Sequence, residues 1–453
     1  ADPALAGGIR CRGGKGRCMS SIARLSTRDA EFEGKLDSLL AFDATQDVAI
    51  EGAVEKIIAD VKARGDEAVL EYTRLFDQWN ARSMDELRLA PQEPARALAR
   101  LSSAQRGALE TAAERIRAYH RKQVLSSWHY TEPDGTMLGQ KITPLDRVGV
   151  YVPGGKAAYP STVLMNVLPA RVAGVGSVVM VVPTPRGERN DLVLAAASIA
   201  GVDQIFTIGG AQAVAALAYG TRTISQTDKV VGPGNAYVSE AKRYAASLPG
   251  GPQIDTPAGP SELMVVADDS ARADFVAADL LSQAEHDGDA QVLLVAASPS
   301  LATRVQEELA HQLKTLPRAE IATRSLENAR CILVEDADTA IDIANLYAPE
   351  HLSLQIAGAE ALAESVRNAG AVFIGPWSAE TFGDYVCGPS HVLPTDGAAR
   401  AWSGVNVASF MKCVNVQTLT QTGAHELARA AARLARLEGL EAHARAADLR
   451  GAH

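Results

Sequence analysis

The alternation of apolar and polar residues changes near residue 147. Before it, apolar positions recur at helical spacing, as in Ala104–Gln123, which follows Ser102 and Ser103, so residues 28–132 are predicted to be mostly helical. After it, short apolar runs predict buried strands over Val148–Val152, Val178–Val182, Gln204–Ile208, Lys229–Val231, Glu262–Val266, Gln291–Ala296, Cys331–Val334, Leu352–Ile356 and Ala371–Ile374. Helical patterns between them lie near Thr162–Val172, Asp191–Ala200, Ala211–Tyr219, Arg272–Ala284, Leu301–Leu313 and Thr339–Tyr347. This alternation is typical of an α/β fold with parallel sheets.

The turn-rich segment Leu248–Pro252 separates two strand–helix series, and the strand pattern stops after about Pro394. The tail from His425 has apolar residues at helical spacing. The first 18 residues hold five glycines and four basic residues without an apolar signal core, so we expect an upstream extension. We expect a disordered extension over 1–24, one α/β domain over 25–146 and 253–393, another over 147–252, and a helical arm over 394–453.

Composition narrows the class of protein. The 44 basic and 54 acidic residues give a net charge of −10, which disfavours binding to nucleic acid or anionic membranes. The sequence contains no stretch of 18 or more apolar residues free of charged residues, so no membrane span is expected. The five cysteines are scattered and odd in number, which favours reduced thiols in a cytoplasmic protein.

Two segments carry candidate acid, base and metal-ligating residues. Gln283 and His286 are three residues apart near a predicted helix end, so they share a helix face and can bind one metal ion; Glu285 points elsewhere. The alternative is a polar helix terminus. Glu350 and His351 follow Pro349, which ends a helix and is expected to make Ala348 extended. This pair suits general acid–base catalysis, and surface decoration is the alternative.

A third segment, residues 382–395, is a glycine- and proline-punctuated loop. It brings Asp384 and His391 near each other, as a metal or substrate site requires. Cys387 lies in the same loop, and we prefer a buried small hydrophobe to a nucleophile for it.

Three glycine turns follow predicted strands in consecutive units and contain Tyr151, Gln212 and Asn235. A strand, a glycine turn and a helix N-terminus together present backbone N–H groups to phosphate. None of the turns matches the G-x-G-x-x-G fingerprint, so ordinary tight turns remain the alternative to a nucleotide site.

Taken together, these segments resemble the histidinol dehydrogenase family from about residue 25 to residue 447. The matching strings, in the order of the family, are Y-V-P-G-G, V-G-P-G-N, D-T-P-A-G-P-S-E, L-L-S-Q-A-E-H-D, A-P-E-H-L, T-F-G-D-Y and S-H-V-L-P-T. The resemblance implies two Rossmann-like domains with helical N- and C-terminal segments that pack in a homodimer. It also implies a four-electron oxidation of L-histidinol through L-histidinal to L-histidine, the last step of histidine biosynthesis, with NAD and one zinc ion per subunit.

The family's residue roles transfer to matching positions of this chain. The resemblance implies zinc ligands at Gln283, His286, Asp384 and His443, catalytic residues Glu350 and His351, and nucleotide contacts at Tyr151, Gln212 and Asn235. It implies substrate contacts at Ser261, His391 and Glu438, alongside the metal ligands and His351. Ser390 stands where we expect many relatives to have Asn, and residues 1–18 have no counterpart in the family's pattern.

The residue types suit this chemistry. His351 is expected to take the hydroxyl proton in both hydride transfers, and Glu350 to activate water for hydration of the aldehyde. The C-terminal arm is expected to cross to the partner, so that active sites are shared between subunits. Two alternative functions account for fewer of these residues. A zinc hydrolase in which Glu350 activates water would give the three glycine turns no role. A non-catalytic protein that binds metal and nucleotide leaves Glu350 and His351 unexplained.

Overall fold

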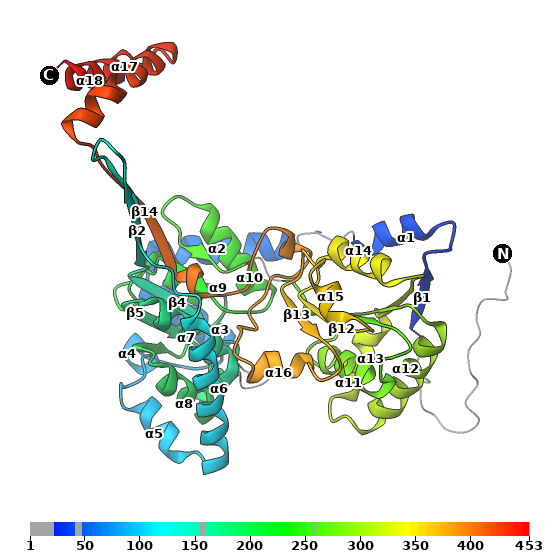
Figure 1. The fold of residues 1–453 in the computed structure, drawn as a ribbon. Helices are drawn as coiled ribbons and strands as arrows, with labels where there is room; N and C mark the ends of the chain where they lie inside the picture. The colour runs from blue at the N-terminus through cyan, green and yellow to red at the C-terminus, as the bar shows by residue number, and fades with distance from the viewer. Residues whose placement is uncertain (1–21, 41–47, 155–158, 257–258, 453) are drawn as a thin grey trace, which may run out of the picture.

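The computed structural model describes residues 22–40, 48–154, 159–256 and 259–452. Residues 1–21 of the expected disordered extension, with Cys11 and Cys18, lie outside these ranges. Ala23 and Arg24, also assigned to that extension, instead begin a strand. The described residues form two lobes around parallel sheets and an arm that projects from one of them (Figure 1).

A six-stranded parallel sheet forms the core of the first lobe. Its strands, in spatial order, are β1 (Ala23–Ser26), β11 (Arg330–Leu333), β10 (Gln291–Ala296), β9 (Glu262–Ala267), β12 (His351–Gln355) and β13 (Ala371–Ile374). One face packs against α11 (Ala273–Ala284), α12 (Pro299–Gln312) and α13 (Ala319–Glu327). The other face packs against α1 (Phe32–Leu40), α14 (Ala337–Tyr347) and α15 (Ala359–Ala363), and α16 (Glu380–Tyr385) follows β13. The order of the strands reverses between β9 and β12.

A five-stranded parallel sheet forms the core of the second lobe. Its strands, in spatial order, are β6 (Gln204–Phe206), β5 (Ser177–Val181), β4 (Arg147–Tyr151), β7 (Lys229–Val231) and β8 (Gln253–Ile254). One core contains α7 (Pro160–Ala173), α8 (Asp191–Ala200), α5 (Glu93–Arg100) and α6 (Ser103–Arg121). The other contains α2 (Val48–Arg64), α3 (Asp66–Phe76), α4 (Met84–Leu87), α9 (Gly210–Tyr219) and α10 (Ala236–Ser247).

The helices between residues 48 and 121 therefore pack on the five-stranded sheet. Ile58 of α2 shares a core with Phe206, and Ile116 of α6 shares one with Leu164. The domain expected over 25–146 and 253–393 places this segment in the other lobe, where only β1 and α1 of the described N-terminal elements pack. Helical periodicity shows which face of a helix is apolar, but not which sheet covers that face.

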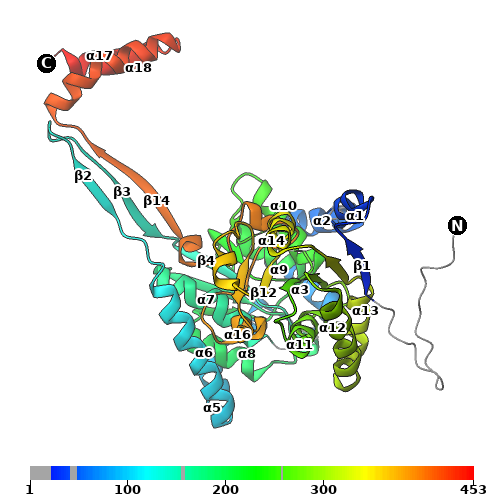
Figure 2. The same ribbon diagram turned by 45° about the vertical axis from the view of Figure 1, so that its right-hand side comes forward.

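The arm is an antiparallel ribbon that carries a helical hairpin at its tip (Figure 2). The ribbon consists of β2 (Trp128–Thr131), β3 (Met137–Pro144) and β14 (Met411–Thr418), and the hairpin of α17 (Gln421–Leu437) and α18 (Glu441–Gly451). The expected end of the strand pattern near Pro394 is therefore wrong. Most of β14 is exposed, so it lacks the apolar pattern that reveals a buried strand.

Candidate active site

Two glutamates and a histidine meet where β9 and β12 begin side by side. Glu262 is the first residue of β9, His351 is the first residue of β12, and Glu350 directly precedes His351. All three side chains are buried. Ala348, which caps α14, adopts a left-handed conformation with φ of 57° and not the extended one expected before Pro349. The tight turn at Ala348 places Glu350 and His351 at the start of β12.

Hydrogen bonds fix this group around Glu262. The Glu350 main-chain N–H donates to Glu262 Oε2 at 3.2 Å, and the Asp396 N–H donates to Glu262 Oε1 at 2.9 Å. His351 Nδ1 lies 2.9 Å from the Glu262 main-chain oxygen. Because a carbonyl oxygen only accepts, Nδ1 is the donor, and the neutral ring carries its lone pair on Nε2. His351 is thus oriented with Nε2 as its basic atom.

Burial and charge shift the proton affinities of these groups. Burial raises the pKa of Glu350 to about 7 and that of Glu262 to about 8. Burial by itself lowers the pKa of His351, but the carboxylates of Glu350, Glu380 and Asp384 outweigh it and place that pKa well above its ordinary value. Glu350 and Glu262 can therefore exchange protons near neutral pH.

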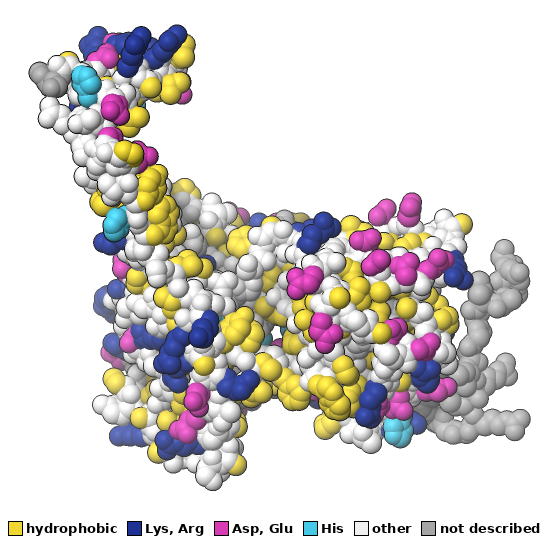
Figure 3. Space-filling view, viewed as in Figure 1, with side chains coloured by type: hydrophobic (Ala, Val, Ile, Leu, Met, Phe, Trp, Pro, Cys, Tyr) yellow, Lys and Arg dark blue, Asp and Glu magenta, His cyan; other side chains and the backbone are white. Residues whose placement is uncertain are grey.

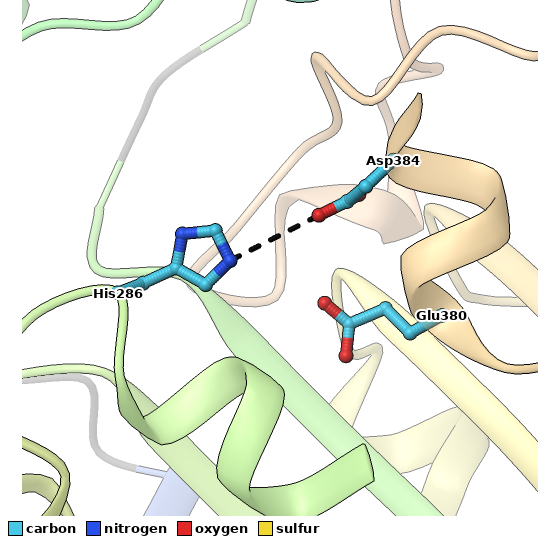
Figure 4. A group of neighbouring side chains, drawn as sticks. All are labelled: His286, Glu380 and Asp384. Atoms are coloured by element: carbon cyan, nitrogen blue, oxygen red, sulfur yellow. Dashed lines mark ion pairs between the residues drawn. The ribbon is translucent and has the colours of Figure 1, made fainter. Parts of the chain in front are cut away.

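A cluster of metal-ligating side chains adjoins His351. His286, Glu380 and Asp384 each offer a ligand atom, and these atoms lie within 4.8 Å of one another. His286 Nε2 lies 3.9 Å from Asp384 Oδ2 (Figure 4), and His351 Nε2 lies 3.6 Å from Asp384 Oδ1. Burial opposes ionisation of Asp384, yet His351, His391 and His286 together lower its pKa. The imidazole and carboxylate groups thus face a common point.

Sequence reasoning missed Glu380 in this cluster. It lies four residues before Asp384 on α16, so both carboxylates share a helix face. Burial raises the pKa of Glu380 to about 8. The spacing of four residues was the available signal. The expectation that Gln283 and His286 share a helix face is wrong, because α11 ends at Ala284 and His286 lies in the turn beyond it.

Unsatisfied polar atoms indicate that this cluster accommodates a ligand. Gln283 is 1% exposed in the last turn of α11, and neither polar atom of its amide has a hydrogen-bond partner. His351 Nε2 and Glu380 Oε2 are likewise buried without a partner. Such atoms cost free energy unless an ion, water or substrate satisfies them. Imidazole, carboxylate and amide donors are compatible with zinc, so the residues present fit that ion.

Other predicted site residues fall into two places. Ser261 lies half-buried directly before β9, and His391 Nδ1 lies 2.9 Å from the Asp384 main-chain oxygen. Glu438 and His443 are exposed on the helical hairpin, which this chain holds away from α11, the helix that ends just before His286 (Figures 1 and 2). Gly439, with φ of 76°, separates α17 from α18. This chain brings Ser261 and His391 to the site and leaves Glu438 and His443 outside it.

The described cysteines form no disulfide. Cys331 is buried, and Cys387 and Cys413 are exposed. The preferred interpretation of Cys387 as a buried hydrophobe is therefore wrong, because the loop turns this side chain toward solvent.

The three glycine turns lie at the carboxyl edge of the five-stranded sheet. The strand order reverses between β4 and β7, which end at Tyr151 and Val231. In open α/β sheets, ligands bind in the crevice at such a reversal. Nearby, a cavity of about 290 Å³ is lined in part by Pro153, Gly154 and Thr184.

The three candidate nucleotide-binding residues differ in their burial and in their hydrogen bonds. Tyr151 is buried, its hydroxyl accepts from the Gly210 N–H at 3.1 Å, and burial raises its pKa to about 12. Gln212 is 1% exposed, and both polar atoms of its amide lack a partner. Asn235 is exposed and caps α10 through Oδ1, which accepts from the Val238 N–H. The turns thus offer buried polar atoms as well as backbone groups.

Comparison with known proteins decides among the possible functions. The family model for histidinol dehydrogenase matches residues 42–451. The chain belongs to the histidinol dehydrogenase family. Curated histidinol dehydrogenases of Dechloromonas aromatica and Nitrosospira multiformis are 54% and 52% identical over 433 residues, which span 95% of this chain and 99% and 98% of theirs. The crystal structure of histidinol dehydrogenase from Elizabethkingia anophelis superposes with a TM-score of 0.88 at 35% identity, covering 95% of this chain and 98% of that one.

Family membership makes the chain an oxidoreductase of histidine biosynthesis that acts on histidinol and depends on zinc and NAD. It excludes the two rival interpretations, a zinc hydrolase and a non-catalytic binding protein. Among the described residues, no helix combines the length and apolarity needed to cross a membrane.

Proposed function

We propose that the cluster around His351 oxidises L-histidinol in two steps, through L-histidinal to L-histidine. The observation that carries this assignment is the buried Glu350–His351 pair beside Gln283, His286 and Asp384, where the Gln283 amide and His351 Nε2 have no hydrogen-bond partner. The arrangement combines two proton acceptors with a place for a polar substrate. Both steps of the oxidation need these elements.

The metal fits one end of this cluster. Gln283, His286 and Asp384 would hold it together with His443 from a second copy of the chain, one ion per subunit. Zinc would supply a Lewis acid that orients the amino alcohol and polarises its oxygen. Ser261, His391 and Glu438 would contact the substrate alongside these ligands.

His351 is the base of the first step. Its Nε2 takes the hydroxyl proton of histidinol while the carbinol carbon passes a hydride to NAD⁺, so a C=O bond forms and NADH leaves. The hydrogen bond from Nδ1 to the Glu262 carbonyl keeps Nε2 available, and the surrounding carboxylates stabilise the imidazolium that results.

Glu350 serves the hydration that must follow. Its pKa of about 7 lets it take a proton from water as the oxygen adds to the aldehyde carbon. His351 then takes a hydroxyl proton of the hydrate as a second hydride passes to a second NAD⁺, which leaves the carboxylic acid. One histidinol, one water and two NAD⁺ thus give histidine and two NADH.

Nucleotide binding is assigned to the other lobe. Tyr151, Gln212 and Asn235 border the reversal point of the five-stranded sheet, where backbone N–H groups and the unsatisfied Gln212 amide can contact a dinucleotide. The assignment is supported by the nearby cavity.

A second copy of the chain completes the site. The hairpin exposes Leu434, Leu437 and Leu440, and hydrophobic side chains gather at its end farthest from the ribbon (Figure 3). A chain end with such a surface needs an apolar neighbour, and a twofold dimer lets each copy supply one to the other. The arm that carries Glu438 and His443 would then reach the partner's His286 cluster.

Spectrophotometry tests the assignment. The purified chain, loaded with zinc, should form two NADH per histidinol consumed, read as absorbance at 340 nm. His351→Asn should abolish both equivalents, whereas Glu360→Gln, an exposed change on α15, should leave both intact. One NADH per histidinol, or full activity in His351→Asn, would overturn the proposal.

A further inference from the structure

A buried ion pair holds the turn that follows β7. The Gly232 N–H donates to Asp255 Oδ2 at 2.7 Å, and Lys242 Nζ donates to the Gly232 carbonyl oxygen at 2.9 Å. Lys242 Nζ also lies 2.5 Å from Asp255 Oδ1, and both side chains are 2% exposed. The backbone N–H and C=O of Gly232 are therefore both bound by one ion pair, Lys242 and Asp255, which we call the clamp.

The clamp joins three elements of the five-stranded lobe. Lys242 lies in α10, Asp255 directly follows β8, and Gly232 directly follows β7. The glycine is required because its φ is 109° and a Cβ there would collide with the carbonyl oxygen of Tyr151. Gly232 therefore packs directly against the backbone of Tyr151.

The same turn leads directly to the cap of α10. A Cβ on Gly234 would collide with the Val238 side chain, and the next residue, Asn235, accepts from the Val238 N–H. The turn is thus packed at Gly232 against Tyr151 and at Gly234 against α10. The backbone position of this turn therefore sets the distance between Tyr151 and Asn235, two of the three candidate nucleotide-binding residues.

Stability alone gives a weak reason for such a pair. Desolvation of two charges offsets most of their attraction, and apolar pairs of similar volume are often as stable in the same place. Binding both backbone polar groups of Gly232, which belong to two successive peptide units, does, however, restrict the turn to one arrangement. The pair is therefore better explained by the geometry that it imposes.

We propose that Lys242 and Asp255 are positioning residues that hold the glycine turn in its NAD-binding form without contacting the nucleotide. The proposal rests on the nucleotide role proposed for Tyr151 and Asn235. When a binding-competent form is only partly populated, the apparent dissociation constant rises in inverse proportion to its population. Loss of the clamp should therefore weaken NAD binding while leaving histidinol binding unchanged.

The test compares Lys242→Met, Asp255→Asn and the double variant as zinc-loaded enzymes. Each should raise the calorimetric dissociation constant for NAD⁺ about tenfold, with KM for histidinol and zinc content unchanged. The single variants leave a buried charge without its partner and should melt at lower temperature. The double variant lacks both charges of the pair and should melt at a higher temperature than either single variant. It should not recover NAD affinity, because Met cannot donate to Gly232.

Thr227→Val is the matched control. Thr227 lies just before β7, at the opposite end of that strand from Gly232. Its Oγ1 donates a buried hydrogen bond to the Leu217 carbonyl oxygen. This variant should lose stability and keep NAD affinity. Equal loss of NAD affinity in Thr227→Val would overturn the clamp in favour of general loosening of the lobe.

Asn235→Ala separates the two proposals. Unchanged NAD affinity in all three clamp variants, with weaker binding in Asn235→Ala, would refute the clamp and keep the nucleotide site. Unchanged affinity in Asn235→Ala would instead refute the proposed nucleotide role of that residue.

Discussion

Glu262 and Glu350 exchange hydrogen bonds, because the main-chain N–H of each donates to the carboxylate of the other, at 2.9 and 3.2 Å. The exchange ties the first residue of β9 to the residue before β12. The Glu262 carbonyl oxygen also accepts from His351 Nδ1, so one residue orients both members of the proton-transfer pair.

Glu262→Gln should lower kcat about tenfold or more. The Glu350 and Asp396 N–H groups donate to different oxygens of Glu262. A glutamine places an NH2 group at one of these two positions, so one buried N–H loses its acceptor. Steady-state kinetics at saturating substrates measure the loss, with Glu360→Gln as the exposed control. A wild-type kcat in a folded Glu262→Gln enzyme would show that the exchange is dispensable.

Glu350→Gln should separate the two chemical steps. The amide cannot take a proton from water, so oxidation of supplied histidinal should fall about 10²- to 10⁴-fold, whereas the first NADH from histidinol forms at its usual rate. Single-turnover absorbance at 340 nm resolves the steps, and His351→Asn should impair both. Equal loss of both steps in Glu350→Gln would contradict the division of labour.

Removal of the metal should abolish turnover and preserve NAD⁺ binding. The candidate ligands lie in the six-stranded lobe and the arm, whereas Tyr151, Gln212 and Asn235 lie in the five-stranded lobe. Chelator-treated enzyme is titrated with NAD⁺ by calorimetry, and zinc is then restored as the control. Loss of nucleotide binding on chelation would show that the two sites are not separable.

Mixed dimers should test whether the site is shared. His443→Ala and His286→Ala are each expected to be inactive, and the two are unfolded and refolded together. With crossed arms, half of the dimers are mixed, and each mixed dimer has one site with both defects and one with neither, so activity returns to about a quarter of wild type. No recovery would place each arm on its own subunit.

Asp77→Asn should change the pH dependence of stability. Asp77 is 8% exposed, its Oδ2 has no hydrogen-bond partner, and burial raises its pKa to about 6. Its unfolded pKa is about 3.9, so between these values the folded state binds more protons and wild-type stability falls as pH rises. Above pH 6 the cost amounts to about 3 kcal/mol, which the variant avoids.

Melting temperatures from pH 4 to pH 8 measure this effect. The advantage of Asp77→Asn over wild type should grow up to about pH 6 and then level off. Asp342→Asn, an exposed substitution on α14, should show no such trend. A constant difference across the range would mean that Asp77 does not titrate in this window.

Apolar runs in the sequence located the strands of both sheets where side chains are buried. The predicted strands Lys229–Val231, Gln291–Ala296 and Ala371–Ile374 have the bounds found in the structure. The exposed ribbon strands and the short β1 and β8 lack such runs and were missed. The sheet on which α2 packs depends on contacts distant in sequence, which local periodicity does not contain.

The same distinction applies to the candidate site. Gln283 with His286 and Glu350 with His351 are close in sequence, so spacing revealed them. Glu262 was present in a matching motif, but its hydrogen bonds depend on β9 and β12 being neighbours. Assigning Glu380 required its burial beside Asp384, which only the fold shows.

The ribbon also fixes an order of events during synthesis. β14 pairs with β3, and Val414 lies opposite Lys141. Because β3 precedes β14 by more than 250 residues, β3 leaves the ribosome long before its partner strand is made. Throughout the synthesis of residues 145–410, one edge of β3 is open to pairing with any other nascent chain. Lys141 lies in the middle of that strand, and a charged side chain on an unpaired edge strand disfavours pairing with another chain.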